Sequence, residues 1–97
     1  MSKRTFRDLF PGRKPLIACI HLWPLPGSPD YGGDVEKVVE LALDETRIFS
    51  ACGVDGLIVE NFRDTPFYPG PLPPETIAAM TAVTREVKGS FRGPVGV

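Results

Sequence analysis

The chain has 97 residues, of which 42% are hydrophobic and 24% are charged, and its formal net charge is −1. A chain of this length and balance can form one small globular domain with a modest core. The near-neutral charge excludes a broad basic surface for nucleic acid, so we expect no nucleic-acid partner. No segment reaches the ~18 apolar residues that a membrane-spanning helix needs.

The first 14 residues form a lead-in that mixes basic and apolar residues. Phe6, Leu9 and Phe10 have the i, i+3, i+4 spacing of one helical face, and the basic residues fall on other faces. The hydrophobic core of a signal peptide is missing from this stretch. The pattern favours a short amphipathic turn that docks on its own domain, and contact with a membrane surface is the alternative.

Strand and helix patterns alternate after the lead-in. Residues 15–21 and 54–61 are short apolar runs bounded by proline or glycine, which is typical of strands buried on both faces of a parallel sheet. Helices are predicted from an Asp34 N-cap to about Gly53, and from Pro74 to Gly89. Residues 94–97 begin a third strand. The predicted buried stripes of the two helices are Val38, Leu41, Ala42, Ile48, Phe49 and Cys52, and then Ile77, Met80, Val83, Thr84 and Val87.

This order predicts an α/β fold of right-handed parallel βαβαβ units. Residues 1–97 are expected to be a single incomplete domain, with the lead-in at 1–14 and the βαβαβ units at 15–97. A closed (β/α)8 TIM barrel needs roughly 250 residues, so we expect a truncated N-terminal portion of such a barrel. The third strand would otherwise need a neighbour from another copy, in a homo-oligomer.

Two long loops, 22–33 and 62–73, follow the carboxyl ends of the predicted strands and are rich in proline, glycine and aromatic residues. Ligands of parallel α/β folds bind beyond these strand ends. We therefore expect a small-molecule pocket here, with Trp23 and Tyr31 among its walls. The alternative is that the loop aromatics, including Phe62, Phe67 and Tyr68, only hold their own loops against the scaffold.

The ends of the two strands carry a histidine and a carboxylate. If Glu60 points away from the helices, side-chain alternation places His21 on the same face of the sheet, together with Cys19. The opposite register would bury an unpaired carboxylate against the helices. We therefore predict His21 and Glu60 as an acid–base or ligand-orienting pair. The alternatives are a His21 hydrogen bond to a loop carbonyl and a structural ion pair between Glu60 and an arginine or lysine.

Asn61 and Asp64 follow the second strand and are candidates for contacts with a substrate hydroxyl. Such residues also organise turns, and this is the favoured reading for Asp64.

Cys19 and Cys52 lie in apolar contexts without C-x-x-C spacing, and the chain has a single histidine. We therefore expect buried, reduced thiols, no metal site and a reducing compartment, which favours the cytoplasm.

Long stretches of the chain resemble the N-terminal part of the BtpA family. They are HLWPLPGSPDYGG, VDGLIVENF and DTPFYPGPLPPETIAAMT, and the lead-in FRDLFPGRKPLIACIHL is similar as well. Trp23 departs from the aliphatic residue expected there. The resemblance implies a (β/α)8 barrel related to ribulose-phosphate-binding barrels. It implies no particular reaction or cofactor, and the phosphate-binding loops of related barrels follow the seventh and eighth strands, outside these residues.

Two functions follow from the resemblance and the loops. The first is binding of, or action on, a small phosphorylated sugar-like metabolite at the carboxyl-end face of the barrel. The alternative is a non-catalytic biogenesis or stability factor for a membrane protein complex, peripheral on the cytoplasmic or thylakoid membrane. Cyanobacterial family members are linked to photosystem I, although the family also occurs in organisms without photosynthesis.

Overall fold

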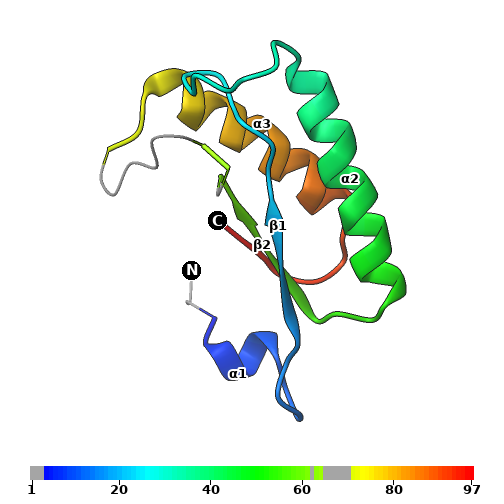
Figure 1. Cartoon of the computed structure of the whole chain (residues 1–97). Helices are drawn as coiled ribbons and strands as arrows, with labels where there is room; N and C mark the ends of the chain where they lie inside the picture. The colour runs from blue at the N-terminus through cyan, green and yellow to red at the C-terminus, as the bar shows by residue number, and fades with distance from the viewer. Residues whose placement is uncertain (1–3, 62, 65–70) are drawn as a thin grey trace.

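The computed structural model describes residues 4–61, 63–64 and 71–97. Its elements are α1 (Phe6–Leu9), β1 (Ile17–His21), α2 (Val35–Ala51), β2 (Gly56–Glu60), α3 (Pro74–Ser90) and β3 (Val95–Gly96). The strands form one parallel sheet in the order β1-β2-β3, and α2 and α3 pack side by side on one of its faces (Figure 1). The predicted α/β class with a parallel sheet is therefore confirmed for this part of the chain.

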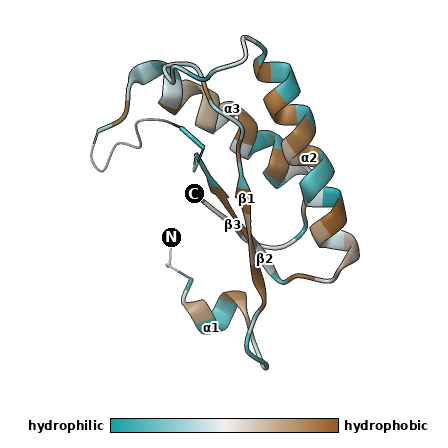
Figure 2. Ribbon diagram, in the orientation of Figure 1, coloured by the Kyte–Doolittle hydropathy of each residue, from teal (hydrophilic) through white to brown (hydrophobic). Residues whose placement is uncertain are grey.

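The pairing of β1 with β2 sets the position of every side chain on the sheet. It runs from Ile17 opposite Gly56 to His21 opposite Glu60 without a break. Ile20 and Val59 are completely buried on the side of the helices, and each such burial contributes ~1.5–3 kcal/mol to stability. Figure 2 shows the hydrophobic colouring of the two strands. The other side of the sheet is not covered by α2 or α3 (Figure 1).

The predicted start of α2 is confirmed. The Asp34 side chain caps the helix by accepting a hydrogen bond of 3.2 Å from the backbone N–H of Lys37. Gly53 follows the helix with a φ of 79°, a conformation that favours glycine. α3 begins at Pro74 as predicted and ends at Ser90, one residue beyond the predicted Gly89.

The predicted buried stripes are partly wrong. Ile48 is 62% exposed and Ile77 is 51% exposed, whereas Thr46 and Thr76 are buried. The Thr46 hydroxyl donates a hydrogen bond of 2.8 Å to the carbonyl of Ala42, so its polar group is satisfied inside the core. The predicted stripes include Ile48 and Ile77 and leave out Thr46 and Thr76, so the true buried face of each helix is centred on other residues than the predicted one.

The lead-in docks on the uncovered face of the sheet at its amino end. Phe10 lies against Gly56, where an added Cβ would come within 3.2 Å of the Phe10 ring. The rings of Phe6 and Phe10 are in tilted contact, with their centroids 5.1 Å apart and their planes at 54°, and Phe6 remains 59% exposed. Docking of the lead-in on its own domain, the favoured interpretation of its stripe, is thus observed for Phe10.

Asp55 anchors the amino end of β1 beside β2. Its carboxylate accepts hydrogen bonds from the Arg13 guanidinium, at 2.9 and 3.1 Å, and from the backbone N–H of Leu16, at 2.8 Å. The Asp55 backbone N–H donates to the Leu16 carbonyl at 2.8 Å. These bonds cross from one strand to the other just before the first residue pair of the ladder, and so they hold its register.

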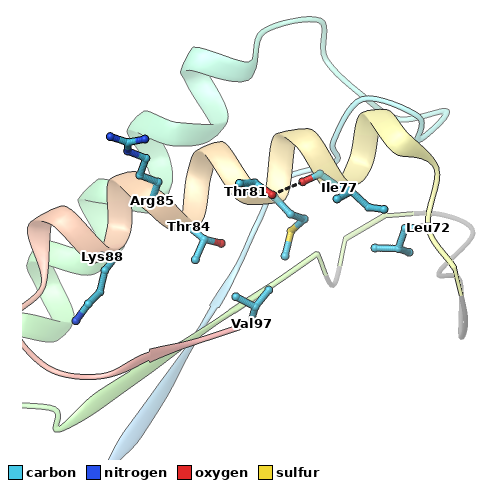
Figure 3. Close-up of a pocket in the computed structure, with 8 residues that line it drawn as sticks. Leu72, Ile77, Thr81, Thr84, Arg85, Lys88 and Val97 are labelled. Carbon is cyan, nitrogen blue, oxygen red and sulfur yellow. Dashed lines mark hydrogen bonds between the residues drawn. The ribbon is translucent and has the colours of Figure 1, made fainter. Parts of the chain in front are cut away.

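A groove of about 520 Å³ lies between α3 and the residues Leu72 and Val97 (Figure 3). Its lining is Leu72, Ile77, Met80, Thr81, Thr84, Arg85, Lys88 and Val97. None of the predicted site residues borders it. Among the described residues, no helix is long and apolar enough to cross a membrane.

Gly93 lies where the chain turns into β3, and it permits a close approach of two backbones. A Cβ at this position would lie 2.6 Å from the Asp55 carbonyl oxygen and 2.7 Å from the Phe91 ring. We expect Gly93→Ala to lower the free energy of unfolding of the full-length protein by ~1–3 kcal/mol, measured by denaturant titration.

Gly89→Ala is the matched control, because no atom lies within 4 Å of the added methyl group and the position is helical. It should raise the free energy of unfolding by up to ~1 kcal/mol. Equal effects of the two substitutions would contradict the close approach at Gly93.

Candidate functional site

The carboxyl ends of β1 and β2 bring His21 and Glu60 together. The two residues are the last of their strands and lie opposite each other in the ladder. His21 Nε2 and Glu60 Oε2 are 3.7 Å apart, and both side chains are partly exposed. Within the described part of the chain, no arginine or lysine forms an ion pair with Glu60. The separation is longer than a direct hydrogen bond, and the role of a proton-transferring pair stays a prediction.

Cys19 lies on the same face as His21, two residues earlier in β1. Its sulfur, a nitrogen of His21 and a carboxylate oxygen of Glu60 all lie within 4.8 Å of one another. Cys19 and Cys52 are both exposed, so the prediction of buried thiols is wrong. Cys19 faces the side of the sheet that α2 and α3 leave open, and Cys52 is the C-cap of α2.

Glu60 governs the acidity of this thiol. A hydrogen bond to the Glu60 carboxylate, with smaller contributions from desolvation and from the negative charge of that carboxylate, raises the pKa of Cys19 above its usual range. The Cys19 side chain is therefore a neutral thiol at neutral pH, not an activated thiolate.

Asp64 ties the two loops together. It is buried, and its carboxylate accepts a hydrogen bond of 2.8 Å from the backbone N–H of Leu25 and one of 3.1 Å from the Asn61 side-chain amide. The backbone N–H of Asp64 also donates to the Asn61 carbonyl at 3.0 Å. Asp64 thus has the turn-organising role that the sequence favours. Contact of Asn61 or Asp64 with a substrate stays a prediction.

The first loop also rests on the start of α3. The Thr76 hydroxyl donates a hydrogen bond of 3.0 Å to the Pro26 carbonyl. Gly27 has a φ of 97°, and a Cβ there would come within 3.0 Å of the Thr76 hydroxyl oxygen. The loop is therefore held at two places, by Asp64 and by α3.

Trp23 borders a small hollow beside α2 that His21 also lines, and Tyr31 lies in the turn of the same loop. Trp23 is 52% exposed, and the Arg63 guanidinium lies 5.5 Å from the centre of its ring. It also lines a hollow of about 220 Å³ between the loop and the start of α2. Tyr31 is half-buried, and its backbone N–H donates to the Ser28 carbonyl at 3.1 Å, within the turn. Phe62, Phe67 and Tyr68 lie outside the described residues.

Sequence reasoning missed two members of this region. Strand alternation places Cys19 on the face of His21, but its apolar context and the lack of C-x-x-C spacing predict a buried thiol and not a member of the site. Arg63 gave no signal of its own, since its partner Trp23 lies 40 residues earlier in the chain.

Comparison with known proteins identifies the family of the chain. The family model described as the BtpA family matches residues 12–97. The chain belongs to the BtpA family. An uncharacterized protein of Pyrococcus furiosus is 48% identical over 91 residues, which cover 94% of this chain and 34% of that protein. The photosystem I biogenesis protein BtpA of Synechocystis is 40% identical over 88 residues, which cover 91% of this chain and 31% of that protein.

The family likeness extends to eukaryotes. A protein of Caenorhabditis elegans whose name carries the word mitochondrial is 31% identical over 75 residues, covering 76% of this chain and 27% of that protein. The chain thus spans about a third of the length of the Pyrococcus furiosus and Synechocystis relatives. No solved structure gave a significant match.

The two hydrogen bonds of the Asp64 carboxylate generate a stability prediction. Asp64→Ala would leave the buried N–H of Leu25 without an acceptor, and we expect a loss of ~1–3 kcal/mol in the free energy of unfolding of the full-length protein. Asp30→Ala, at an exposed aspartate of the same loop, is the control and should change stability by less than ~0.5 kcal/mol. Denaturant unfolding measures both. A loss below ~0.5 kcal/mol for Asp64→Ala would show that this link between the loops is not needed.

Proposed function

We propose that this BtpA-family chain forms part of a (β/α)8 barrel that binds a small phosphorylated sugar-like metabolite at the carboxyl ends of its strands. The parallel sheet with two covering helices, and the relatives of about three times the length, support a larger barrel. In such a barrel the sheet face that α2 and α3 leave open becomes the interior. A cytoplasmic location is part of the proposal.

The observation that carries the proposal is the pairing of His21 with Glu60 on that open face. An imidazole beside a carboxylate can take a proton from a substrate and return it at neutral pH. Among the described residues, the Glu60 carboxylate lies beside the imidazole and the Cys19 thiol and forms no ion pair with an arginine or lysine side chain.

The open face of the sheet changes from apolar to polar between its amino and carboxyl ends, and this change also supports a ligand at the carboxyl end. Phe10 and Gly56 pack together at the amino end, where the surface is apolar. The polar groups gather at the carboxyl end, where the anchored loop 22–33 begins. Small-molecule sites combine such an apolar base with a few convergent polar groups.

Ligand binding by the full-length protein tests the proposal. Sugar phosphates of three to six carbons, titrated calorimetrically, should include at least one that binds, and His21→Ala and Glu60→Gln should each weaken its affinity by ~10-fold or more. Glu40→Gln is the matched control, because Glu40 lies on the outer surface of α2, where it pairs with Lys37. Unchanged affinity and turnover in both site variants would contradict the proposed roles.

A second candidate function is that of a non-catalytic biogenesis or stability factor for a membrane protein complex. The name of the Synechocystis relative, photosystem I biogenesis protein BtpA, which is 40% identical, favours it. On this chain the exposed Phe6 at the start of α1, with Arg4 and Arg7 beside it, offers an apolar contact flanked by positive charge.

Membrane fractionation separates the two functions. If α1 contacts a membrane complex, Phe6→Asp should move the full-length protein from the membrane fraction to the supernatant. Ile48→Asp is the control, since Ile48 is equally exposed but lies on α2. Substitution of Phe6 is a better test than deletion of residues 1–10, because Phe10 packs on Gly56 and the loss of Phe10 would disturb the sheet. An unchanged distribution of Phe6→Asp would reject α1 as the contact.

A further inference from the structure

We infer that Cys19, His21 and Glu60 form a binding site for one zinc-class divalent ion at the carboxyl edge of β1 and β2. They offer a sulfur, an imidazole nitrogen and a carboxylate oxygen, all within 4.8 Å of one another. The inference deepens the proposed function, on which it rests for the role of the ion in ligand binding: with the ion bound, His21 and Glu60 orient the ligand through the metal and do not transfer protons themselves. It also departs from the sequence-based expectation that the chain holds no metal.

The distances fit a tetrahedral ion. Zinc binds nitrogen and oxygen at about 2.0–2.2 Å and sulfur at about 2.3 Å, so neighbouring ligand atoms in such a site are roughly 3.4–3.6 Å apart. His21 Nε2 and Glu60 Oε2 are 3.7 Å apart, which is longer than a direct hydrogen bond and close to this separation. The Cys19 sulfur lies within 4.8 Å of both, and in a tetrahedral site it would lie about 3.6 Å from each.

The strands hold the three residues in place. Cys19 and His21 are two residues apart in β1 and so project from the same face, and His21 lies opposite Glu60 in the ladder. The Leu22 backbone N–H donates to the Glu60 carbonyl at 2.9 Å, which extends the ladder one bond beyond the pair. A site carried by paired strands is more precisely positioned than one carried by loops.

The donor set selects the class of ion. Thiolate and imidazole are ligands of zinc and other transition metals, whereas magnesium and calcium take oxygen ligands. A thiolate and a carboxylate together carry two negative charges, which match one divalent cation. Binding replaces the thiol proton by the ion and releases that proton to solvent.

Three protein ligands leave the fourth position of the ion open, which is the pattern of catalytic zinc sites. The cluster includes the last residues of β1 and β2, at the carboxyl ends of the strands, which is the end of such a barrel where ligands bind. A water molecule or an oxygen atom of the proposed sugar-like ligand can occupy the fourth position.

Cobalt(II) is the probe, because a thiolate bound to it gives a charge-transfer band in the near ultraviolet. Full-length protein is stripped with a chelator and titrated with cobalt(II) alone. We expect one ion per chain with this band, the loss of the band in Cys19→Ser, and at least ~10-fold weaker binding in His21→Ala and Glu60→Gln. Cys52→Ser is the matched control and should keep the band, since Cys52 lies at the far end of α2.

Two results would overturn the inference: no stoichiometric cobalt binding, or a band that persists in Cys19→Ser. If circular dichroism shows that Cys19→Ser does not fold, the cobalt titration is repeated with Cys19→Asp. This variant keeps an anionic ligand, so bound cobalt without the band supports the site, and an unchanged band rejects it.

Failure of this inference is distinguishable from failure of the proposed function. The cobalt band is recorded without any sugar phosphate, and the sugar-phosphate titration is repeated on chelator-treated protein. If the protein takes up no cobalt but binds a sugar phosphate without metal, the metal site is rejected and the proposed function stands. If the protein takes up cobalt but binds no sugar phosphate, the proposed function is rejected and the metal site is supported.

Discussion

The in-register pairing of β1 with β2 is the constraint on which the rest of this structure depends. It places His21 opposite Glu60 and turns Cys19 to the same face, and it sends Ile20 and Val59 into the core. A slip of one residue would exchange the two faces of the shifted strand, burying its polar side chains against the helices. Aspartate carboxylates hold the two ends of the pairing: Asp55 beside the first pair, and Asp64 through the loops that follow the last one.

This arrangement divides the open face of the sheet into two regions. The amino end is apolar and is filled by Phe10 of the lead-in. The carboxyl end gathers the chain's one histidine with a thiol and a carboxylate. Asp64 and Thr76 hold the loop 22–33 in position above this end. The loop must contact both the second loop and the start of α3, and its proline- and glycine-rich composition suits the backbone shape that these two contacts need.

Several parts of this arrangement are predictable from the sequence. Strand alternation is sufficient to place His21 and Glu60 on one face, because a buried unpaired carboxylate would be costly. The Asp34 cap and the two long helices follow from local residue preferences that the tertiary structure does not overrule. The family likeness rests on long loop strings and was confirmed by the match over residues 12–97.

Other parts depend on contacts that no local pattern reveals. The burial of Thr46 depends on a hydrogen bond within its own helix, and the exposure of Ile48 depends on where the sheet lies beneath α2. Cys19 is apolar by residue type, yet it is exposed because it lies on the face that the helices do not cover. The cation–π contact between Arg63 and Trp23 joins two loops that meet only after the strands have paired.

A crystal structure of the full-length protein tests the register most directly. The account predicts that His21 and Glu60 lie opposite each other at the end of the first two strands, with the imidazole and the carboxylate within about 4 Å and the Cys19 sulfur on the same face. A ladder displaced by one residue, with Glu60 opposite Ile20 or Leu22 and turned toward the helices, would contradict it.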